Sequence, residues 1–205
     1  MVRKITLGML AFSLIQAAGA QTTYRGEALV VGARVLGISV SIEDTGSLPS
    51  SGGSLSTELL NVNLPTLLKA DLLSANTSGQ NGETNSRASV ADVSLTVPGV
   101  TVTASVLSSS ATATCRNAFG SSVVLDLKVN GLSVFVTGAP NQTVPLLVGT
   151  LVINEQSSSV VNTSQGSSGD MLVNALHLRV LGVADVVISS SRAGVSCAAV
   201  TGVPG

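Results

Sequence analysis

Tryptophan is absent from this chain of 205 residues, and aromatic residues make up only 2% of it. The aromatic side chains are Phe12, Tyr24, Phe119 and Phe135. Carbohydrate-binding sites commonly place the apolar face of a sugar on a flat aromatic ring, and such rings also anchor many interfaces. Their scarcity therefore argues against a carbohydrate module that binds by stacking.

Charged residues are also scarce, at 10% of the chain. Without residues 1–20 the chain has eight basic and eleven acidic residues, a net charge of −3. The sequence shows no basic cluster, so nucleic acid and anionic membranes are not expected partners. The apolar residues come in short segments broken by Ser, Thr, Gly and Asn, which predicts many short strands.

Histidine occurs once, and cysteine twice. A lone histidine without clustered carboxylates or thiols makes a poor zinc site, and a catalytic cysteine needs a histidine base beside it. Strand periodicity places His177 on one face with Val173, Ala175 and Arg179, as a partly exposed strand residue. We expect neither a metal nor an organic cofactor.

Residues 1–20 have the pattern of an export signal. Arg3 and Lys4 precede the mostly apolar run Ile5–Ile15, and Ala18-Gly19-Ala20 provides a small-x-small cleavage site. The run is too short to span a bilayer. The mature chain is expected to begin at Gln21, to form a single all-β domain over residues 21–205, and to have no transmembrane span.

The mature chain reads as nine or ten strands with almost no helix, which predicts an antiparallel β-sandwich or a closed β-barrel. Residues 26–42 form a first strand region. Val100, Val102, Ala104 and Val106 alternate with polar residues and are expected to share one buried face. Asn130-Gly131 predicts a two-residue hairpin turn, and Pro98-Gly99 predicts another turn. Residues 66–74 fit a strand or a helical turn, and their surroundings favour the strand.

Three polar stretches, residues 44–57, 76–87 and 156–170, are expected to be loops. Acidic side chains lie in or beside them at Glu43, Asp44, Glu83 and Asp170, but without the spacing of a calcium-binding loop. A structural calcium ion remains an alternative, although no metal ligand is assigned.

Two stretches, residues 88–115 and 174–197, contain the same succession of a Val-Ala-Asp-Val box, three serines and a terminal cysteine. Two cysteines in an exported chain most often form a disulfide, so we expect Cys115 to pair with Cys197. Two free buried thiols are the alternative. Asp92 and Asp185, one in each box, form a conceivable but otherwise unsupported carboxylate pair for glycoside hydrolysis.

Several short boxes occur in a suggestive order: Ser89–Val93, Ala139–Thr143, Ile153–Gln156, Val173–His177, and the cysteines Cys115 and Cys197. In this order they resemble the choice-of-anchor P proteins, which are exported bacterial surface proteins. The resemblance covers roughly residues 26–197. It implies an exported surface domain that is released or held non-covalently, and it carries no established activity, so no catalytic residue is assigned. The candidate binding residues in these boxes are Asn141, Asn154, Glu155 and His177.

The sequence thus predicts an extracellular or cell-surface β-domain with a structural or adhesive role and no enzymatic activity. A module that binds a glycan or another ligand is the first alternative, and a hydrolase is the second. The expected partners are components of the cell envelope or of the extracellular matrix. Long Val- and Thr-rich strands also allow self-association through their edges.

Overall fold

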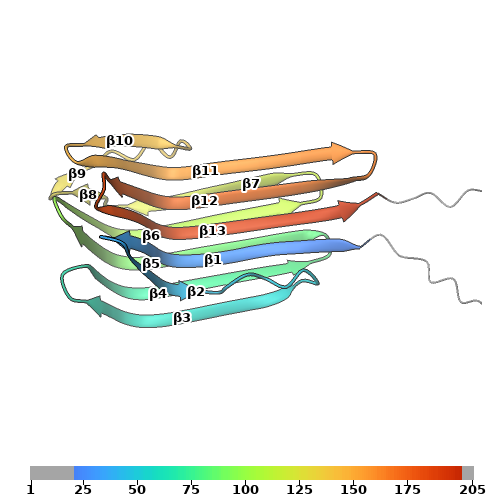
Figure 1. Cartoon of the computed structure of the whole chain (residues 1–205), viewed down its shortest axis with the longest axis horizontal. Coiled ribbons are helices and arrows are strands. Elements are labelled where there is room, and N and C mark those ends of the chain that lie inside the picture. Colours follow the sequence, from blue (N-terminus) through green and yellow to red (C-terminus); the bar gives the residue numbers. More distant parts are fainter. Residues whose placement is uncertain (1–20, 200–205) are drawn as a thin grey trace, which may run out of the picture.

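The computed structural model describes residues 21–199, which form thirteen β-strands and no helix. The strands make two antiparallel sheets packed face to face (Figure 1). Sheet A has the order β10–β11–β12–β13–β1–β2, with β1 (Thr22–Val35), β2 (Ile38–Asp44), β10 (Gln142–Leu146), β11 (Gly149–Thr163), β12 (Gly166–Val180) and β13 (Ala184–Ala198). The expected signal peptide, residues 1–20, lies outside the described residues.

Sheet B has the order β3–β4–β5–β6–β8–β9, and β7 also pairs with β6. Its strands are β3 (Gly53–Leu64), β4 (Leu68–Gln80), β5 (Glu83–Val97), β6 (Val100–Thr114), β7 (Ala118–Leu125), β8 (Lys128–Val129) and β9 (Leu132–Ser133). Both sheets have free edges, so the fold is an open sandwich rather than a closed barrel. The all-β prediction is confirmed, whereas the expected number of strands was too low.

Two of the three expected loops are wrong, because strands continue through them, and some of the expected strands are divided, which raises the strand number. Residues 76–87 belong to β4 and β5, which join through the two-residue turn Asn81-Gly82. Residues 156–170 belong to β11 and β12, which join at Ser164-Gln165. The first polar stretch is a loop only as far as Gly52, where β3 follows. Residues 26–42 likewise form a hairpin, with its turn at Leu36-Gly37, instead of one strand.

Serine and threonine occur in β4, β5 and β13 partly because the interior of this part of the sandwich is polar, whereas residues 157–163 of β11 are exposed. Thr84 Oγ1 donates a hydrogen bond of 2.9 Å to the carbonyl oxygen of Gly194 in the opposite sheet. Ser189 Oγ donates in the same way, over 2.8 Å, to the carbonyl oxygen of Ala88. Such bonds satisfy buried hydroxyl groups and require the two sheets to lie close together. The same interior region contains further buried hydroxyl residues: Thr77, Ser86, Ser109 and Ser191.

A row of residues with left-handed backbone crosses both sheets at one level. In sheet A they lie in alternate strands β2, β13 and β11, and in sheet B in β3, in β5 and at the β7–β8 junction. Their φ angles are between 49° and 58°. The members of this left-handed row are Glu43, Asn61, Asp92, Asp126, Asn154 and Ser189. The long strands of both sheets bend together part-way along their length (Figure 1), and four of the six residues are Asn or Asp, which tolerate this conformation best.

The left-handed row shifts the alternation of buried and exposed side chains by one residue without changing the strand register. In β5 the buried residues are Ala88 and Val90 before the row, and Val93 and Leu95 after it. Pairing between β5 and β6 nevertheless continues with the same offset on both sides. An uninterrupted period of two cannot describe these strands.

This shift corrects two expectations from the sequence. Val106 was expected to share a buried face with Val100 to Ala104, but the fully buried residue in that part of β6 is Leu107. His177 was expected to share a face with Val173. Val173 packs in the core beside the disulfide, whereas His177 lies beyond the row with its side chain among charged groups on the outside of sheet A. The expected partial exposure of His177 is also wrong, because the residue is buried, with a relative exposure of 8%.

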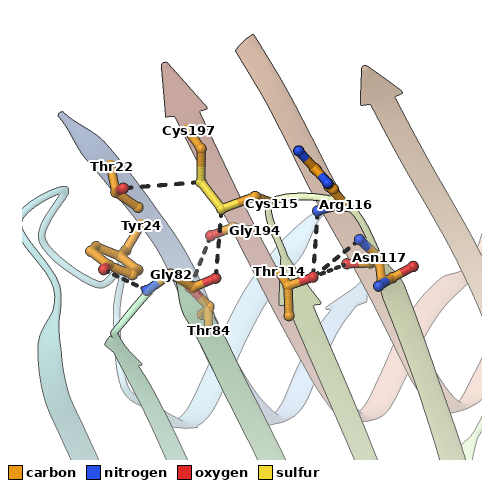
Figure 2. The surroundings of a disulfide bond; sticks show 10 residues. All are labelled: Thr22, Tyr24, Gly82, Thr84, Thr114, Cys115, Arg116, Asn117, Gly194 and Cys197. Carbon is orange, nitrogen blue, oxygen red and sulfur yellow. Dashed lines mark hydrogen bonds between the residues drawn. A yellow bond between two sulfur atoms is a disulfide. The ribbon is translucent and has the colours of Figure 1, made fainter. Parts of the chain in front are cut away.

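The disulfide Cys115–Cys197 is confirmed and joins the two sheets. Cys115 follows β6, Cys197 lies in β13, and their Cα atoms are 5.6 Å apart (Figure 2). The separation of 82 residues recurs at Ser109 and Ser191, whose hydroxyl oxygens are 2.7 Å apart. The strands β6 and β13 therefore run side by side across the sandwich with a constant offset, and the repeated serines face each other.

The turns predicted from dipeptides are also confirmed. Asn130 and Gly131 have φ angles of 50° and 78°, as a type I′ hairpin requires, and Gly99 has a φ angle of 85° after Pro98. Residues 68–74 are the beginning of strand β4, as their surroundings indicated.

Replacing Asp92 by valine tests the left-handed row. A β-branched residue resists positive φ, so Asp92→Val should lower the free energy of unfolding by about 1–3 kcal/mol. Asp92→Asn should retain the stability of the parent, because asparagine accepts this conformation. Ser94→Val, at an ordinary position of the same strand, controls for the added valine. Urea titration measures the free energy of unfolding of all three variants. An Asp92→Val protein as stable as the parent would contradict this account of the row.

Removing the disulfide tests its contribution to stability. Closing a loop of 82 residues should stabilise the fold by about 4–5 kcal/mol in the chain-entropy model. We therefore expect the variant Cys115→Ala/Cys197→Ala to unfold at a much lower urea concentration. Titration of the denatured, unreduced parent should find no free thiol. Two free thiols per chain would rule out the bond.

Candidate functional site

Two of the four candidate binding residues, Asn141 and Asn154, have their side chains engaged by neighbouring strands. The Asn141 side chain bonds the main chain of Gln156, with Oδ1 accepting from the backbone N–H over 2.8 Å and Nδ2 donating to the carbonyl oxygen over 3.3 Å. Asn154 is buried, belongs to the left-handed row and donates to the carbonyl oxygen of Gly138. Both asparagines therefore hold β11 and the segment before β10 in place.

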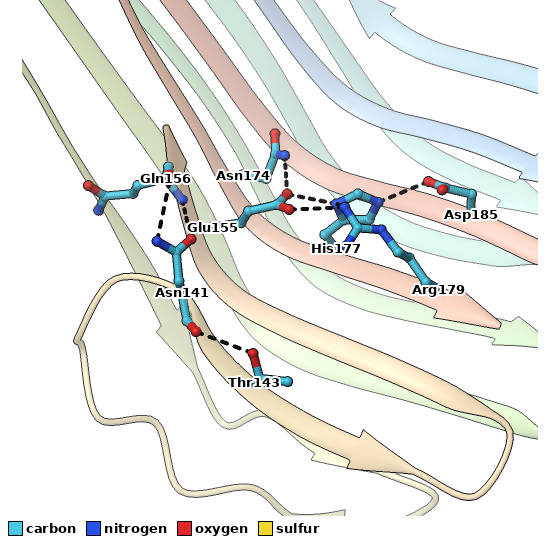
Figure 3. Close-up of polar contacts among 8 residues, drawn as sticks. All are labelled: Asn141, Thr143, Glu155, Gln156, Asn174, His177, Arg179 and Asp185. Carbon is cyan, nitrogen blue, oxygen red and sulfur yellow. Dashed lines mark hydrogen bonds and ion pairs between the residues drawn. The ribbon is translucent and has the colours of Figure 1, made fainter. Parts of the chain in front are cut away.

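The other two, Glu155 and His177, meet in a cluster on the outer side of sheet A (Figure 3). Glu155 Oε2 lies 2.6 Å from His177 Nδ1, and Asp185 Oδ1 lies 2.9 Å from His177 Nε2. Asn174 Nδ2 donates to Glu155 Oε2 over 2.7 Å, and Arg179 donates to Oε1 over 3.1 Å. The His177 cluster consists of these five residues, from the adjacent strands β11, β12 and β13.

Three members of the cluster, Asn174, Arg179 and Asp185, were not among the candidate binding residues, and Asp185 was considered only as a catalytic partner of Asp92. No spacing in the sequence indicates them, because the contacts join different strands and depend on their pairing. Glu155 pairs with Asn174, and Arg179 pairs with Asp185. The left-handed conformation of Asn154 then reorients the strand immediately before Glu155.

Opposing effects set the pKa of Glu155. Burial alone would raise it, but hydrogen bonds from Asn174 and His177, together with the charges of His177 and Arg179, lower the pKa below its ordinary value. The carboxylate is therefore held in its charged form, as an ion that is paired and hydrogen-bonded.

The cluster is internally satisfied to a large extent. Both ring nitrogens of His177 face a carboxylate oxygen, and the guanidinium of Arg179 lies 3.0 Å from Nδ1. The side-chain oxygen of Asn174 is buried without a hydrogen-bond partner. Among residues 21–199, no group of three or more His, Cys, Asp and Glu side chains is placed to hold a metal ion.

The conceivable catalytic pair of Asp92 and Asp185 is not formed. Asp92 lies in β5 of sheet B beside Ser105 and Asp126, whereas Asp185 lies in β13 of sheet A and bonds His177. Both side chains are exposed on the outer faces of different sheets, so they cannot act on one glycosidic bond.

A second candidate surface lies at the end of the sandwich opposite the disulfide. Three hairpin turns there carry a leucine at the apex: Leu36-Gly37, Leu147-Val148 and Leu181-Gly182. The relative exposure of Leu36 is 70% and that of Leu181 is 85%, and Leu147 is fully exposed. We call this end the apolar tip; Ile38 and Leu132 beside the turns are also exposed.

The leucines occupy positions that ordinarily take polar residues or glycine. Two-residue hairpins favour Asn-Gly and related pairs, as at Asn130-Gly131. Leu36 instead has a φ angle of 48°, a conformation unfavourable for a large side chain. At the disulfide end the turns are polar, including Asn81-Gly82 and Ser164-Gln165. Leucine therefore replaces the usual polar turn residues only at this end of the sandwich. Such a local departure from turn preferences is typical of a functional surface.

The tip also contains an open apolar crevice of about 590 Å³ between the two sheets. Leu36 and Ile38 line it from sheet A, and Leu67, Val97 and Pro98 line it from the opposite side. A smaller hollow of about 310 Å³ lies nearby, with Arg34 and Arg179 on its walls next to Leu181. Apolar contact area and positive charge are thus adjacent at this end.

Comparisons with known proteins identify no relative: no family model, no curated protein and no solved structure matches this chain. Within residues 21–199, no helix has the length and apolar character needed to cross a membrane.

The lowered pKa of Glu155 predicts how the stability of the fold depends on pH. Its pKa is lower in the folded chain than in the unfolded chain, where it is about 4.3, so the contribution of Glu155 to stability is present above that value. It is lost as the pH falls through the folded pKa. Glu155→Gln should weaken this acid dependence and cost roughly 1–3 kcal/mol at neutral pH, because hydrogen bonds to a charged group are lost.

Urea unfolding midpoints between neutral and acidic pH measure this effect. The exposed Glu58 of β3 provides a matched control, and Glu58→Gln should keep the acid dependence of the parent. An unchanged pH profile in Glu155→Gln would show that the cluster does not contribute to stability through this carboxylate.

Proposed function

We propose that this chain is an exported, non-enzymatic surface domain, and that it attaches to the cell envelope through its apolar tip. The observation that carries the proposal is the set of three hairpin turns with exposed leucines at their apices. Exposed apolar patches on soluble domains commonly mark interaction sites. Each leucine that becomes fully buried on contact contributes roughly 1.5–3 kcal/mol to the free energy of binding.

The arrangement of the sandwich supports an adhesive role. Strand β1 begins and β13 ends beside the disulfide, so both ends of the described chain lie away from the tip (Figure 1). A contact at the tip leaves that end accessible. The disulfide itself supports export, since such bonds persist mainly in oxidising compartments. The resemblance to choice-of-anchor P surface proteins agrees with this role.

A second candidate function is a ligand-binding module that uses the His177 cluster. The specific observation in its favour is the buried side-chain oxygen of Asn174, which has no partner beside the charged Glu155. Buried polar atoms are usually satisfied, so a small polar ligand or a water molecule fits there. The two functions predict loss of binding from different substitutions.

Sedimentation with isolated cell-envelope fragments tests the main proposal. The purified protein should pellet with the fragments, and Leu36→Ser/Leu147→Ser/Leu181→Ser should lose most of that binding, because the apolar contact is removed. A matched control replaces three exposed apolar residues from the other half: Phe119→Ser/Val123→Ser/Val160→Ser. This control should bind like the parent.

The outcome discriminates between the two functions once thermal melting has shown that both variants are folded. Tip-variant binding equal to that of the parent would contradict attachment through the tip. If Asn174→Ala abolished binding instead, the ligand-binding module would be the better description.

A further inference from the structure

We propose that the surface contacted by the apolar tip is a lipid bilayer containing anionic phospholipid. The inference rests on the proposed function, because it names the partner of the same tip. It departs from the expectation drawn from composition, which excluded anionic membranes because no basic cluster is visible along the sequence.

The fold separates charges that are mixed along the sequence. On the tip side of the left-handed row lie residues 31–42, 62–70, 93–104, 127–153 and 176–188. They contain four basic residues, Arg34, Lys69, Lys128 and Arg179, and one acidic residue, Asp185. The rest of the described chain contains four basic and ten acidic residues. The tip half therefore has a formal net charge of +3 within a protein that is negative overall; of its four cations, Arg179 is paired with Glu155 from beyond the row.

The four cations lie at a common depth behind the tip. Arg34 precedes the apical Leu36 by two residues, Arg179 precedes Leu181 by two, and Lys128 precedes the turn residue Asn130 by two. Lys69 follows Leu67, in the turn between β3 and β4, by two residues. Two strand residues span about 7 Å. Interfacial segments bury their apolar groups by about 5–10 Å, which places these cations among the phosphate groups when the leucines insert.

The shape of the tip also favours a fluid lipid surface. The leucines project from the apices of three turns that lie side by side, joined by backbone hydrogen bonds from Leu36 to Val183 and from Leu181 to Val148. The crevice lined by Leu36, Ile38 and Leu67 is apolar and open, and a segment of an acyl chain fits its volume of about 590 Å³. A second copy bound tip to tip is disfavoured, because each tip carries a net charge of +3 and the two would repel.

Sedimentation with vesicles of defined composition tests the inference. The purified protein should bind vesicles of equal parts phosphatidylcholine and phosphatidylglycerol, bind pure phosphatidylcholine much less, and lose affinity at high salt. Leu147→Ser/Leu181→Ser should weaken binding by at least about tenfold, because two inserted side chains are lost.

Removing basic residues from the tip is the second test of the lipid inference. Arg34→Gln/Lys128→Gln should weaken binding to anionic vesicles about twenty-five-fold, since each basic residue near such a surface contributes about fivefold. Neither residue forms an ion pair within residues 21–199. Arg87→Gln/Arg116→Gln removes the same charge from exposed positions on the other half and should change binding little.

The results separate this inference from the proposed function. Tip-dependent binding to envelope fragments without binding to either vesicle would overturn the lipid inference and leave attachment through the tip intact. Absence of binding to both would overturn both proposals. Equal losses from the two charge variants would show a general charge effect and contradict docking through the tip. A dimer in sedimentation velocity that Leu181→Ser dissociates would instead identify a second copy as the occupant and overturn the lipid inference.

Discussion

The left-handed row is the constraint on which the rest of this structure depends. Six residues with positive φ lie at one level of two sheets, and the strands bend there without losing register. Because the alternation of buried and exposed side chains shifts by one residue at the row, the interior on each side takes a different set of side chains. The cost of an unfavourable backbone conformation is small at Asn and Asp and larger at Ser189 and Glu43, where the paired residues on either side maintain it.

The two halves defined by the row differ in how they are stabilised. Toward the disulfide, small residues and hydroxyl groups let the sheets approach, and side chains bond the main chain of the opposite sheet. The covalent bond between Cys115 and Cys197 holds this thin region together. Toward the tip, larger side chains such as Leu95, Leu151 and Ile188 fill a conventional apolar core, and its apolar character continues outward into the turns.

The tip and the His177 cluster are two candidate sites that differ in the structural elements that form them. The cluster lies on a sheet face and is assembled from three paired strands, so its groups are largely engaged with one another. The tip is assembled from turns, where side chains project into solvent and no neighbouring strand covers them. Loops on a rigid scaffold are common places for binding function. This difference is why we assign attachment to the tip, and a structural role to most of the cluster.

The sequence by itself determined the all-β class, the turns at Asn130-Gly131 and Pro98-Gly99, and the pairing of the only two cysteines, because these depend on local backbone preference and on composition. It indicated Glu155 and His177 but could not place them together, since cross-strand contacts depend on register. The polar ends of β4 and β5 were mistaken for loops because hydroxyl groups are buried only when an opposite sheet supplies acceptors. Residues 157–163 of β11 were mistaken because an exposed polar strand has the composition of a loop. The tertiary structure alone decided that Arg34, Lys69, Lys128 and Arg179 gather at one end, because segments distant in sequence meet there only after both sheets have formed.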